Sequence, residues 1–428
     1  MLSLTESDRL TKVGPGTPMS ELMRRYWQPI ALSEQVKADG DPLRAMLLGE
    51  RFVVFRDTEG RVGVLDEMCM HRGVSLALGR NEEGGLRCLY HGWKFAVDGA
   101  VLETPNACGI KAGLKAPAYP AYEKAGIIWT YIGPQDQIPP RRSFAYESVP
   151  EGNLVVLRAN INANWLPLME GGLDSSHVPI LHTNQIRPAW GAAARGEVAS
   201  DQNQWQNLEG NLAPDFKVAK TIFGFHYCAL RSQPGTDGES NARLAPAILP
   251  NIRLISFGQA NVCAIEVPIN DERTSTYVMI YSDTHPVDRD QQRHTFGFDT
   301  SFYNDETCDF TLDWSNGLGQ DRAAMKTNWT GYAGIELEDF AVSVSLGSDW
   351  DRSKEHLVKS DIAVVYLRRV LLENLELMRA GKSPQALHIA DLSEVAIYDR
   401  TLRADEDWQQ FVPDYDELFR PALAEADA

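Results

Sequence analysis

Two cysteines and two histidines stand in paired positions in the segment CMHRGVSLALGRNEEGGLRCLYH. One residue separates Cys69 from His71, two residues separate Cys88 from His91, and sixteen residues lie between the pairs. Thiolates and imidazoles are the ligands that soft and borderline metals prefer. The spacing predicts a Rieske [2Fe–2S] centre, in which two cysteines hold one iron and two histidines hold the other.

Two other interpretations of these four residues need no iron–sulfur cluster. A structural zinc site uses the same set of two Cys and two His ligands. Alternatively, four core residues that bind no metal would have to fall into this spacing by accident, which is the weaker alternative. The choice between iron and zinc therefore depends on the rest of the chain.

A second candidate centre lies in the segment LDSSHVPILH. His177 and His182 are five residues apart, and on a continuous helix their side chains would point about 140° away from each other. Pro179 disfavours helix at the residue before it, so we expect the chain to turn between the two histidines. Asp174 shares a helix face with His177, and Glu170 lies one turn earlier on the same side. A carboxylate and two imidazoles suit an iron(II) site with open positions for oxygen. Histidines that cap a helix end remain the alternative.

The elements around the Cys–His pairs are predicted to be β-strands. Between residues 44 and 66 the apolar runs AMLLG, FVVFRD and VGVLD are separated by turn residues. Asp98-Gly99 lies between two further strand-like runs and predicts a hairpin. A short helix is expected at 17–26, and a proline-containing linker at 133–144. These elements predict a small antiparallel β domain that presents two ligand loops.

The elements beyond the second centre differ from this first region. Residues 197–320 are mostly runs that alternate apolar with polar residues, which predicts an antiparallel sheet curved over a pocket. The segment SDIAVVYLRRVLLENLELMRAG has apolar residues at helical spacing and closes on Gly381. It predicts a long amphipathic helix near the end of the chain.

Composition limits the classes of protein and of partner. A length of 428 residues favours two or three domains. The net charge of −18 argues against nucleic acid and anionic membrane surfaces as partners. No apolar run approaches the roughly 18 residues of a membrane span, and the N-terminus lacks signal-peptide features. Six cysteines do not make a disulfide framework in so long a chain. We expect a cytoplasmic protein.

Three segments resemble one family. CMHRG and CLYHGWKF resemble the Rieske box of ring-hydroxylating and demethylating oxygenases, and NWLPLMEGGLDSSHVPILH resembles their iron-binding segment. GIELEDFAVSVSLGSDW resembles the C-terminal block of the phthalate dioxygenase-like branch. The resemblance implies an α+β fold. Its parts are an N-terminal helical segment (1–25), a Rieske [2Fe–2S] antiparallel β domain (26–140), and a catalytic domain (141–428) with a curved antiparallel sheet and C-terminal helices.

The resemblance also implies roles for particular residues. It adds Asp339 to His177 and His182 as a ligand of a mononuclear non-heme Fe(II). Family members usually have an amide before this aspartate, whereas this chain has Glu338, which we expect to face solvent. Asp174 matches the carboxylate that links an iron-bound histidine of one subunit to the Rieske histidine, here His91, of the next subunit.

The implied activity is that of a terminal oxygenase component. It would use O2 and reductase-supplied electrons to hydroxylate an aromatic, carboxylated substrate, as a homotrimer or trimer-based hexamer. The electrons would come from a separate reductase, because the chain has no G-x-G-x-x-G motif for a nicotinamide or flavin. The resemblance implies that this reductase is an NAD(P)H-dependent flavin and [2Fe–2S] protein. Arg243 is preferred to Arg231 as the carboxylate anchor, although either could be a surface charge. Two alternatives are demethylation or other monooxygenation of a methoxy- or N-methyl aromatic, and electron transfer without oxygenase activity.

Overall fold

The computed structural model describes residues 2–106, 113–182, 213–232 and 238–419. The chain forms two compact units. We call Val13–Arg141 with Val267–Asp271 the N-terminal unit, and Met1–Lys12, Arg142–Glu266 and Glu272–Ala428 the large unit. No helix among the described residues has the length and apolar character that crossing a membrane requires.

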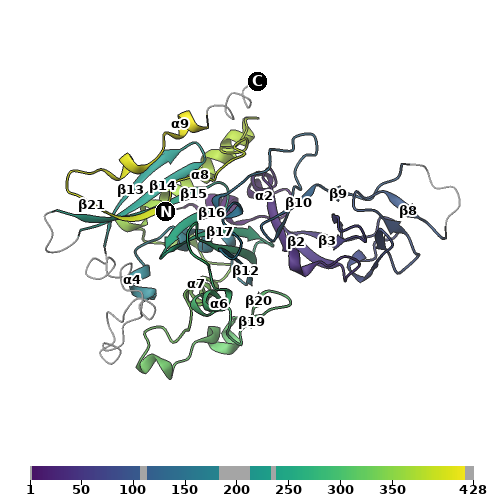
Figure 1. Ribbon diagram of the computed structural model, residues 1–428, viewed down its shortest axis with the longest axis horizontal. Coiled ribbons are helices and arrows are strands. Elements are labelled where there is room, and N and C mark those ends of the chain that lie inside the picture. The colour runs from purple at the N-terminus through teal and green to yellow at the C-terminus, as the bar shows by residue number, and fades with distance from the viewer. Residues whose placement is uncertain (1, 107–112, 183–212, 233–237, 420–428) are drawn as a thin grey trace. The chain divides into compact units, whose positions relative to one another are not determined.

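Short antiparallel strands make up the N-terminal unit. They are β1 (Gln28–Leu32), β2 (Leu43–Leu47), β3 (Glu50–Arg56), β4 (Val62–Asp66), β5 (Arg80–Glu82), β6 (Gly85–Arg87), β7 (Lys94–Phe95), β8 (Val101–Glu103), β9 (Ala118–Tyr119), β10 (Ala121–Lys124) and β11 (Ile127–Thr130). Their three sheets have the strand orders β1-β11-β10, β2-β3-β4-β9 and β5-β6-β7-β8, and several of these strands are labelled in Figure 1. The prediction of an antiparallel β domain is confirmed.

Two local predictions can be compared with this unit. Helix α2 (Pro18–Met23) begins where expected, and the Thr17 hydroxyl accepts a hydrogen bond from the Ser20 amide. The hairpin between β7 and β8 also forms, but its turn differs from the predicted two-residue one. The Gly99 N–H donates to the Ala96 carbonyl at 2.9 Å, and Gly99 has a φ of 81°. The loop is therefore a four-residue turn that ends in a left-handed glycine.

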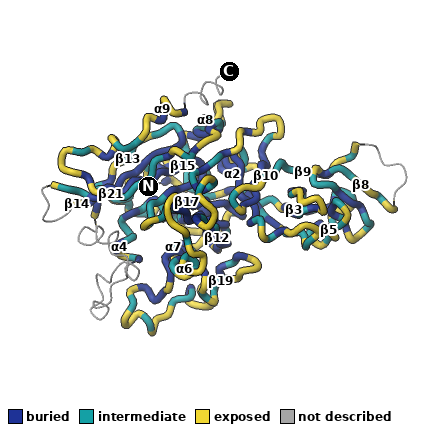
Figure 2. Tube along the Cα trace, viewed as in Figure 1, coloured by how far each residue is buried: buried dark blue, intermediate teal, exposed yellow. Residues whose placement is uncertain are grey.

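One sheet of ten strands dominates the large unit. Its strands are β12 (Leu154–Ile161), β13 (Asp215–Thr221), β14 (Gly224–Ser232), β15 (Ser240–Ile248), β16 (Ile252–Phe257), β17 (Ala260–Pro268), β18 (Thr274–Tyr281), β19 (Tyr303–Asn304), β20 (Asp309–Phe310) and β21 (Tyr398–Leu402). The order is β13-β14-β15-β16-β17-β18-β12-β20-β19, with β21 beside β15. Much of this sheet is buried, as the dark blue of β15 in Figure 2 shows. The predicted large antiparallel sheet is confirmed, although residues 197–212 lie outside the described part.

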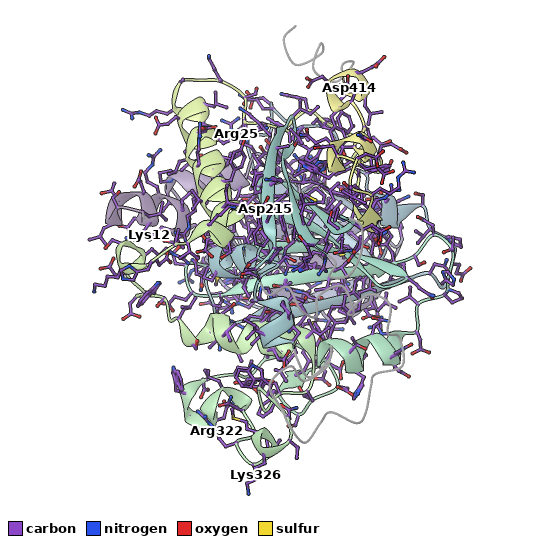
Figure 3. The ribbon with its side chains drawn as sticks, turned by 90° about the vertical axis from the view of Figure 1, so that its left-hand side faces the viewer. Lys12, Arg25, Asp215, Arg322, Lys326 and Asp414 are labelled. Carbon is purple, nitrogen blue, oxygen red and sulfur yellow. The ribbon has the colours of Figure 1, made fainter. Side chains whose placement is uncertain are left out.

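The helices of the large unit surround this sheet. They are α1 (Leu4–Thr11), α3 (Trp165–Gly172), α4 (Val178–Leu181), α6 (Arg289–Phe296), α7 (Ile335–Ser345), α8 (Ile362–Arg379) and α9 (Tyr415–Leu418). Helix α8 is the predicted C-terminal helix, and Gly381, with a φ of 74°, follows it. Helix α8 lies beside β13, the strand that begins at Asp215, which is labelled in Figure 3. Lys359, just before α8, forms an ion pair with the Asp215 carboxylate at 3.0 Å.

The N-terminal residues divide between the two units. Helix α1 belongs to the large unit, whereas α2 belongs to the N-terminal unit. The Trp165 indole N–H donates to the carbonyl of Leu10 at 3.0 Å, and the Asn164 amide donates to the carbonyl of Thr11 at 2.9 Å. These bonds attach α1 to the start of α3, the helix that leads into the second candidate centre.

Candidate metal centres and pocket

The two Cys–His loops of the N-terminal unit close in the same way. The Cys69 N–H donates to the Val74 carbonyl, and the Cys88 N–H donates to the Trp93 carbonyl, at 2.9 and 2.8 Å. In each loop the glycine four residues after the cysteine donates back to the cysteine carbonyl and has a φ above 70°. Each cysteine is thus held at the base of a tight turn, for which a left-handed glycine is needed.

The two histidine side chains of these loops lie close together, and so do the two cysteine side chains. The rings of His71 and His91 are 4.5 Å apart, and the ring of Trp93 stacks on that of His71 at 4.7 Å. Burial raises the pKa of the Cys69 thiol to about 11, with a further contribution from the neighbouring Cys88 thiol. Two adjacent thiolates therefore need a compensating cation. Burial, His71 and Arg72 lower the pKa of His91, which favours the neutral ring that ligates metals. This donor set fits a Rieske cluster.

In the large unit, the chain between the two predicted iron histidines differs from the expectation. We expected Pro179 to break the helix between His177 and His182. Instead Pro179 lies in the first turn of α4, where its missing N–H costs no hydrogen bond. The break comes earlier, after α3 ends at Gly172. Because α4 is one turn long and His182 leaves it with a ψ of 22°, the two imidazoles still meet.

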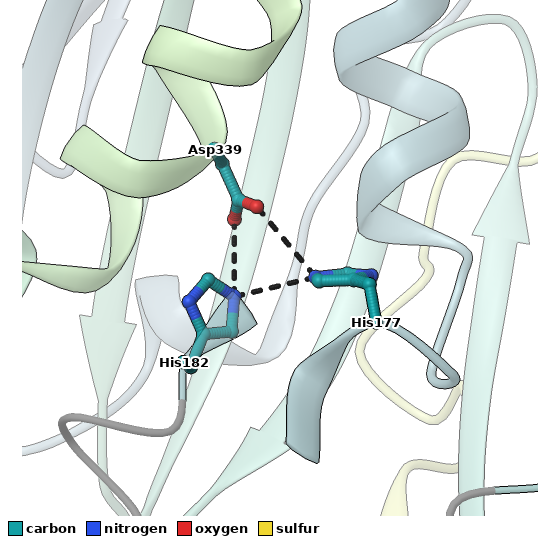
Figure 4. Close-up of side chains that lie close together, drawn as sticks. All are labelled: His177, His182 and Asp339. Atoms are coloured by element: carbon teal, nitrogen blue, oxygen red, sulfur yellow. Dashed lines mark hydrogen bonds and ion pairs between the residues drawn. The ribbon is translucent and has the colours of Figure 1, made fainter. Parts of the chain in front are cut away.

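His177, His182 and Asp339 form a compact group, shown in Figure 4. The two Nε2 atoms are 3.2 Å apart. The Asp339 carboxylate oxygens lie 3.6 Å from Nε2 of His177 and 3.5 Å from Nε2 of His182. Metal–ligand bonds of about 2.1 Å place neighbouring ligand atoms roughly 3.0–3.4 Å apart. The two Nε2 atoms have this spacing, and the two Asp339 oxygens, one near each histidine, lie only slightly farther away, so the group can occupy one face of a metal coordination sphere.

The core packing of α7 explains how Asp339 reaches the histidines. Leu337, Phe340 and Ala341 are buried in the core with residues of β12 and β18. Their spacing places them on one face of the helix, and Asp339 lies outside this face. Burial lowers the pKa of His182, but Asp339 and Glu338 outweigh it and raise that pKa to about 10. Two carboxylates thus favour a positive charge here, as a bound metal ion would provide.

The structure contradicts our expectation for Glu338. We expected it to face solvent, but it is fully buried, and its Oε2 lies 2.7 Å from Nδ1 of His182. Its other oxygen accepts a hydrogen bond from the Thr330 hydroxyl at 2.5 Å. Sequence reasoning missed this residue because adjacency to Asp339 does not show which way a helical side chain points.

Asp174 lies in the loop between α3 and α4 rather than on a continuous helix. Its Oδ2 is 3.4 Å from Nδ1 of His177, so the two side chains are still close. Its Oδ1 accepts hydrogen bonds from the backbone N–H and the hydroxyl of Ser176, at 2.7 and 2.5 Å. Burial raises the pKa of Asp174, but His177 and Ser176 outweigh it, and the net shift is downward. Asp174 is therefore a carboxylate beside the ring nitrogen that faces away from the candidate metal.

A pocket opens beside the three candidate ligands. Its apolar wall includes Ile255, Phe257, Val262, Phe296 and Ile335. Its polar residues include Arg243, which we predicted, and Arg253 and Glu336, which we did not. Arg231 does not line this pocket and is fully buried, with Nη2 donating to the carbonyl of Ser175 at 2.8 Å. Neither Arg231 nor Arg243 is the surface charge that we considered.

Arg253 could not have been found by spacing alone. It bonds Glu266 at 2.9 Å, and both side chains are buried within the sheet. A side chain at Gly172 would collide with the Arg253 guanidinium, which explains one of the two glycines at the end of α3. In the sequence, the Gly-Gly pair at the end of α3 indicates that another group approaches closely, but it does not indicate that this group is Arg253.

Comparison with known families decides which metals these centres hold. A family described as the Rieske [2Fe-2S] domain matches residues 26–117, and one described as LigXa C-terminal domain like matches residues 130–427. The chain belongs to the Rieske oxygenases. This Rieske oxygenase is 39% identical to the phthalate 4,5-dioxygenase oxygenase subunit of Pseudomonas putida, over 97% of its own length and 96% of that protein.

A second relative and a solved structure are also similar to this chain. The 3-chlorobenzoate-3,4-dioxygenase oxygenase subunit of Comamonas testosteroni is 32% identical, over 90% of this chain and 92% of that protein. Dicamba monooxygenase bound to dicamba shares the fold, with a TM-score of 0.57 and 17% identity over 84% of this chain and 99% of that chain.

The predicted family, enzyme class and cofactors are thereby confirmed. This Rieske oxygenase is the terminal oxygenase component of a system that also needs a reductase. It carries a Rieske [2Fe–2S] cluster and a mononuclear non-heme iron. The structural zinc site and the electron carrier without oxygenase activity are excluded.

Proposed function

We propose that this Rieske oxygenase hydroxylates an aromatic carboxylate at an iron held by His177, His182 and Asp339. The observation that carries the proposal is that each of the three residues offers a ligand atom within 4.8 Å of the others, beside a pocket. The bound iron supplies oxygen activation, and the cluster supplies single electrons. In the proposed Rieske domain, 26–140, the cluster ligands are Cys69, His71, Cys88 and His91. The iron ligands lie in the proposed catalytic domain, 141–428.

Arg243 supports the choice of a carboxylated substrate. Its side chain lines the pocket and is largely buried, and Nη2 donates to the Ser256 carbonyl at 3.0 Å, which fixes the guanidinium. A fixed guanidinium can bind a carboxylate through two parallel hydrogen bonds. The apolar residues Ile255 and Phe257 would contact the aromatic ring. Phthalate and 3-chlorobenzoate, named for the two relatives, are aromatic carboxylates.

The assembly and the electron path belong to the same proposal. In a homotrimer, or a hexamer built from trimers, Asp174 would link His177 to His91 of a neighbouring subunit. The partly exposed Asp174 carboxylate beside Nδ1 of His177 supports this role, because one carboxylate can accept from two imidazole N–H groups. The reductase would be a flavin and [2Fe–2S] protein that uses NADH or NADPH, and the location would be the cytoplasm.

Product analysis tests the reaction. The purified oxygenase, a competent reductase and NADH are supplied with a panel of aromatic carboxylates, some carrying methoxy groups. We expect a dihydrodiol, which identifies dihydroxylation. A phenol with released formaldehyde would identify O-demethylation instead, the alternative that the same constellation allows. Oxygen consumption without any hydroxylated product across the panel would contradict an aromatic carboxylate as substrate.

A further inference from the structure

Glu338 makes two close contacts inside the large unit. Its Oε2 lies 2.7 Å from Nδ1 of His182, and its Oε1 accepts from the Thr330 hydroxyl at 2.5 Å. Both Glu338 and His182 are buried, with 0% and 3% exposure. A buried carboxylate with both oxygens engaged has little freedom to move. Glu338 therefore holds one fixed position against one edge of the imidazole ring.

The opposite edge of the same ring faces the metal residues. Nε2 of His182 lies 3.2 Å from Nε2 of His177 and 3.5 Å from Asp339. A carboxylate at Nδ1 keeps the proton on that nitrogen, which leaves the lone pair on Nε2. The contact with Glu338 thus selects both the tautomer and the ring orientation that a metal ligand needs.

Glu338 and Asp339 are adjacent on α7, and this adjacency lets one helix contact both edges of the ring. Successive residues point about 100° apart around a helix. Asp339 approaches His182 at Nε2, and Glu338 approaches it at Nδ1. The face of α7 that carries Leu337 and Phe340 is buried in the core, so the helix cannot rotate without disrupting that packing.

We propose that Glu338 is a positioning residue that fixes His182 for metal binding and, as a carboxylate, strengthens the affinity of the site for its metal. The proposal rests on the proposed function, because it takes His182 as a ligand. A carboxylate on the distal nitrogen makes an imidazole a stronger donor. A glutamine at this position would accept the same hydrogen bond without the negative charge.

Glu336 provides a matched control. It lies on the same helix two residues earlier, is buried, and lines the pocket, but its Oε2 has no hydrogen-bond partner among the described residues. Glu336→Gln removes a carboxylate at a similar depth without altering the contact with His182. Burial raises the pKa of Glu336, so the two variants are compared at several pH values above neutral.

The experiment measures cobalt(II) binding to protein from which the mononuclear iron has been removed while the cluster is retained. The cluster absorption and the thermal unfolding midpoint show that each variant is folded. We expect Glu338→Gln to weaken cobalt(II) binding about 10- to 100-fold, Glu338→Leu to weaken it further, and Glu336→Gln to change it far less. The visible spectrum of bound cobalt(II) should also change in the Glu338 variants only.

Two outcomes would overturn the inference. If Glu338→Gln binds cobalt(II) like the wild type, the contact does not position His182. If Glu336→Gln and Glu338→Gln weaken binding equally, only the local charge matters. A different result would overturn the proposed function instead. If the wild-type protein, with its cluster intact, binds no cobalt(II), then His177, His182 and Asp339 are not a metal site.

Discussion

At the scale of single residues, the protonated and unprotonated edges of the imidazoles decide what the site can do. His177 and His182 direct their Nε2 atoms toward each other and toward Asp339. Their Nδ1 atoms each face a different carboxylate, Asp174 for His177 and Glu338 for His182. The two carboxylates differ in exposure, since Glu338 is fully buried and Asp174 is partly exposed. This difference fits the roles proposed above, which are positioning of His182 for the buried carboxylate and contact with a neighbouring subunit for the accessible one.

Asp174→Asn tests this assignment. We expect the variant to keep its metals and its assembly but to lose nearly all turnover, because an amide has no charge and accepts fewer N–H bonds than a carboxylate. The measurement is single turnover with a pre-reduced cluster: the cluster of the variant should stay reduced after substrate and oxygen are added. Normal reoxidation would show that Asp174 is not on the electron path, and loss of the mononuclear iron would make it a structural support.

Arg243→Gln tests substrate recognition. The loss of a charge-assisted hydrogen bond costs about 1.5–3 kcal/mol, so kcat/KM for a carboxylated substrate should fall roughly 10- to 150-fold. The same measurement with the matching carboxamide provides the control, because an uncharged amide gains little from the guanidinium. If the substitution lowers kcat/KM equally for both compounds, Arg243 shapes the pocket and does not read the carboxylate.

At the scale of elements, the end of α3 must satisfy both the metal site and the core. Glu170 in α3 makes two hydrogen bonds to Arg368 of α8, at 2.6 and 2.9 Å. Arg352 and Glu355 complete this buried cluster, with Arg352 bonding Glu170 at 3.0 Å. We had expected Glu170 to share the side of Asp174. It faces α8 instead, so the helix before the iron site is anchored away from the pocket.

Glu170→Gln should destabilise the large unit by up to about 3 kcal/mol, because the buried guanidinium groups of Arg352 and Arg368 then share the single carboxylate of Glu355. Denaturant unfolding measures this change in free energy. Glu373→Gln is the matched control: it breaks an exposed ion pair with Arg369 one turn away on α8, and exposed pairs contribute little to stability. Equal effects of the two substitutions would contradict the structural role of the buried cluster.

The two glycines at the end of α3 allow a comparison of neighbouring positions. An added Cβ at Gly171 meets no atom within 4 Å, whereas one at Gly172 collides with the Arg253 guanidinium. Gly171→Ala should be neutral or stabilise the helix by up to about 1 kcal/mol. Gly172→Ala should displace Arg253 and reduce both stability and kcat. Thermal unfolding and turnover, measured on both variants, check this; equal behaviour would show that Arg253 moves aside without consequence.

At the scale of the whole molecule, the proposed trimer pairs the cluster of one subunit with the iron of the next. This can be tested by mixing two inactive variants, His182→Ala, which lacks the iron site, and Cys88→Ser, which lacks the cluster. Co-expressed mixed trimers should regain activity, because some neighbours then combine an intact cluster with an intact iron. Random assembly makes about a quarter of neighbouring pairs competent. Mixed trimers without activity would place the electron path within one subunit.

The sequence alone was enough to predict features that depend only on nearby residues of the chain. The Cys–His loops are short, and their ligand spacing and glycines are set within a few residues, so Cys69 to His91 could be interpreted without a structure. His177 and His182 could also be picked out from the sequence, but the break in the helix was predicted at Pro179 and lies after Gly172 instead. The tertiary structure decided the features that depend on distant partners. Asp339 reaches the histidines because the core face of α7 orients that helix. Glu338 and Arg253 are buried because His182 and Glu266 face them. A charged residue shows no partner in its own neighbourhood of the sequence, and only long-range packing determines whether it meets water or another buried charge.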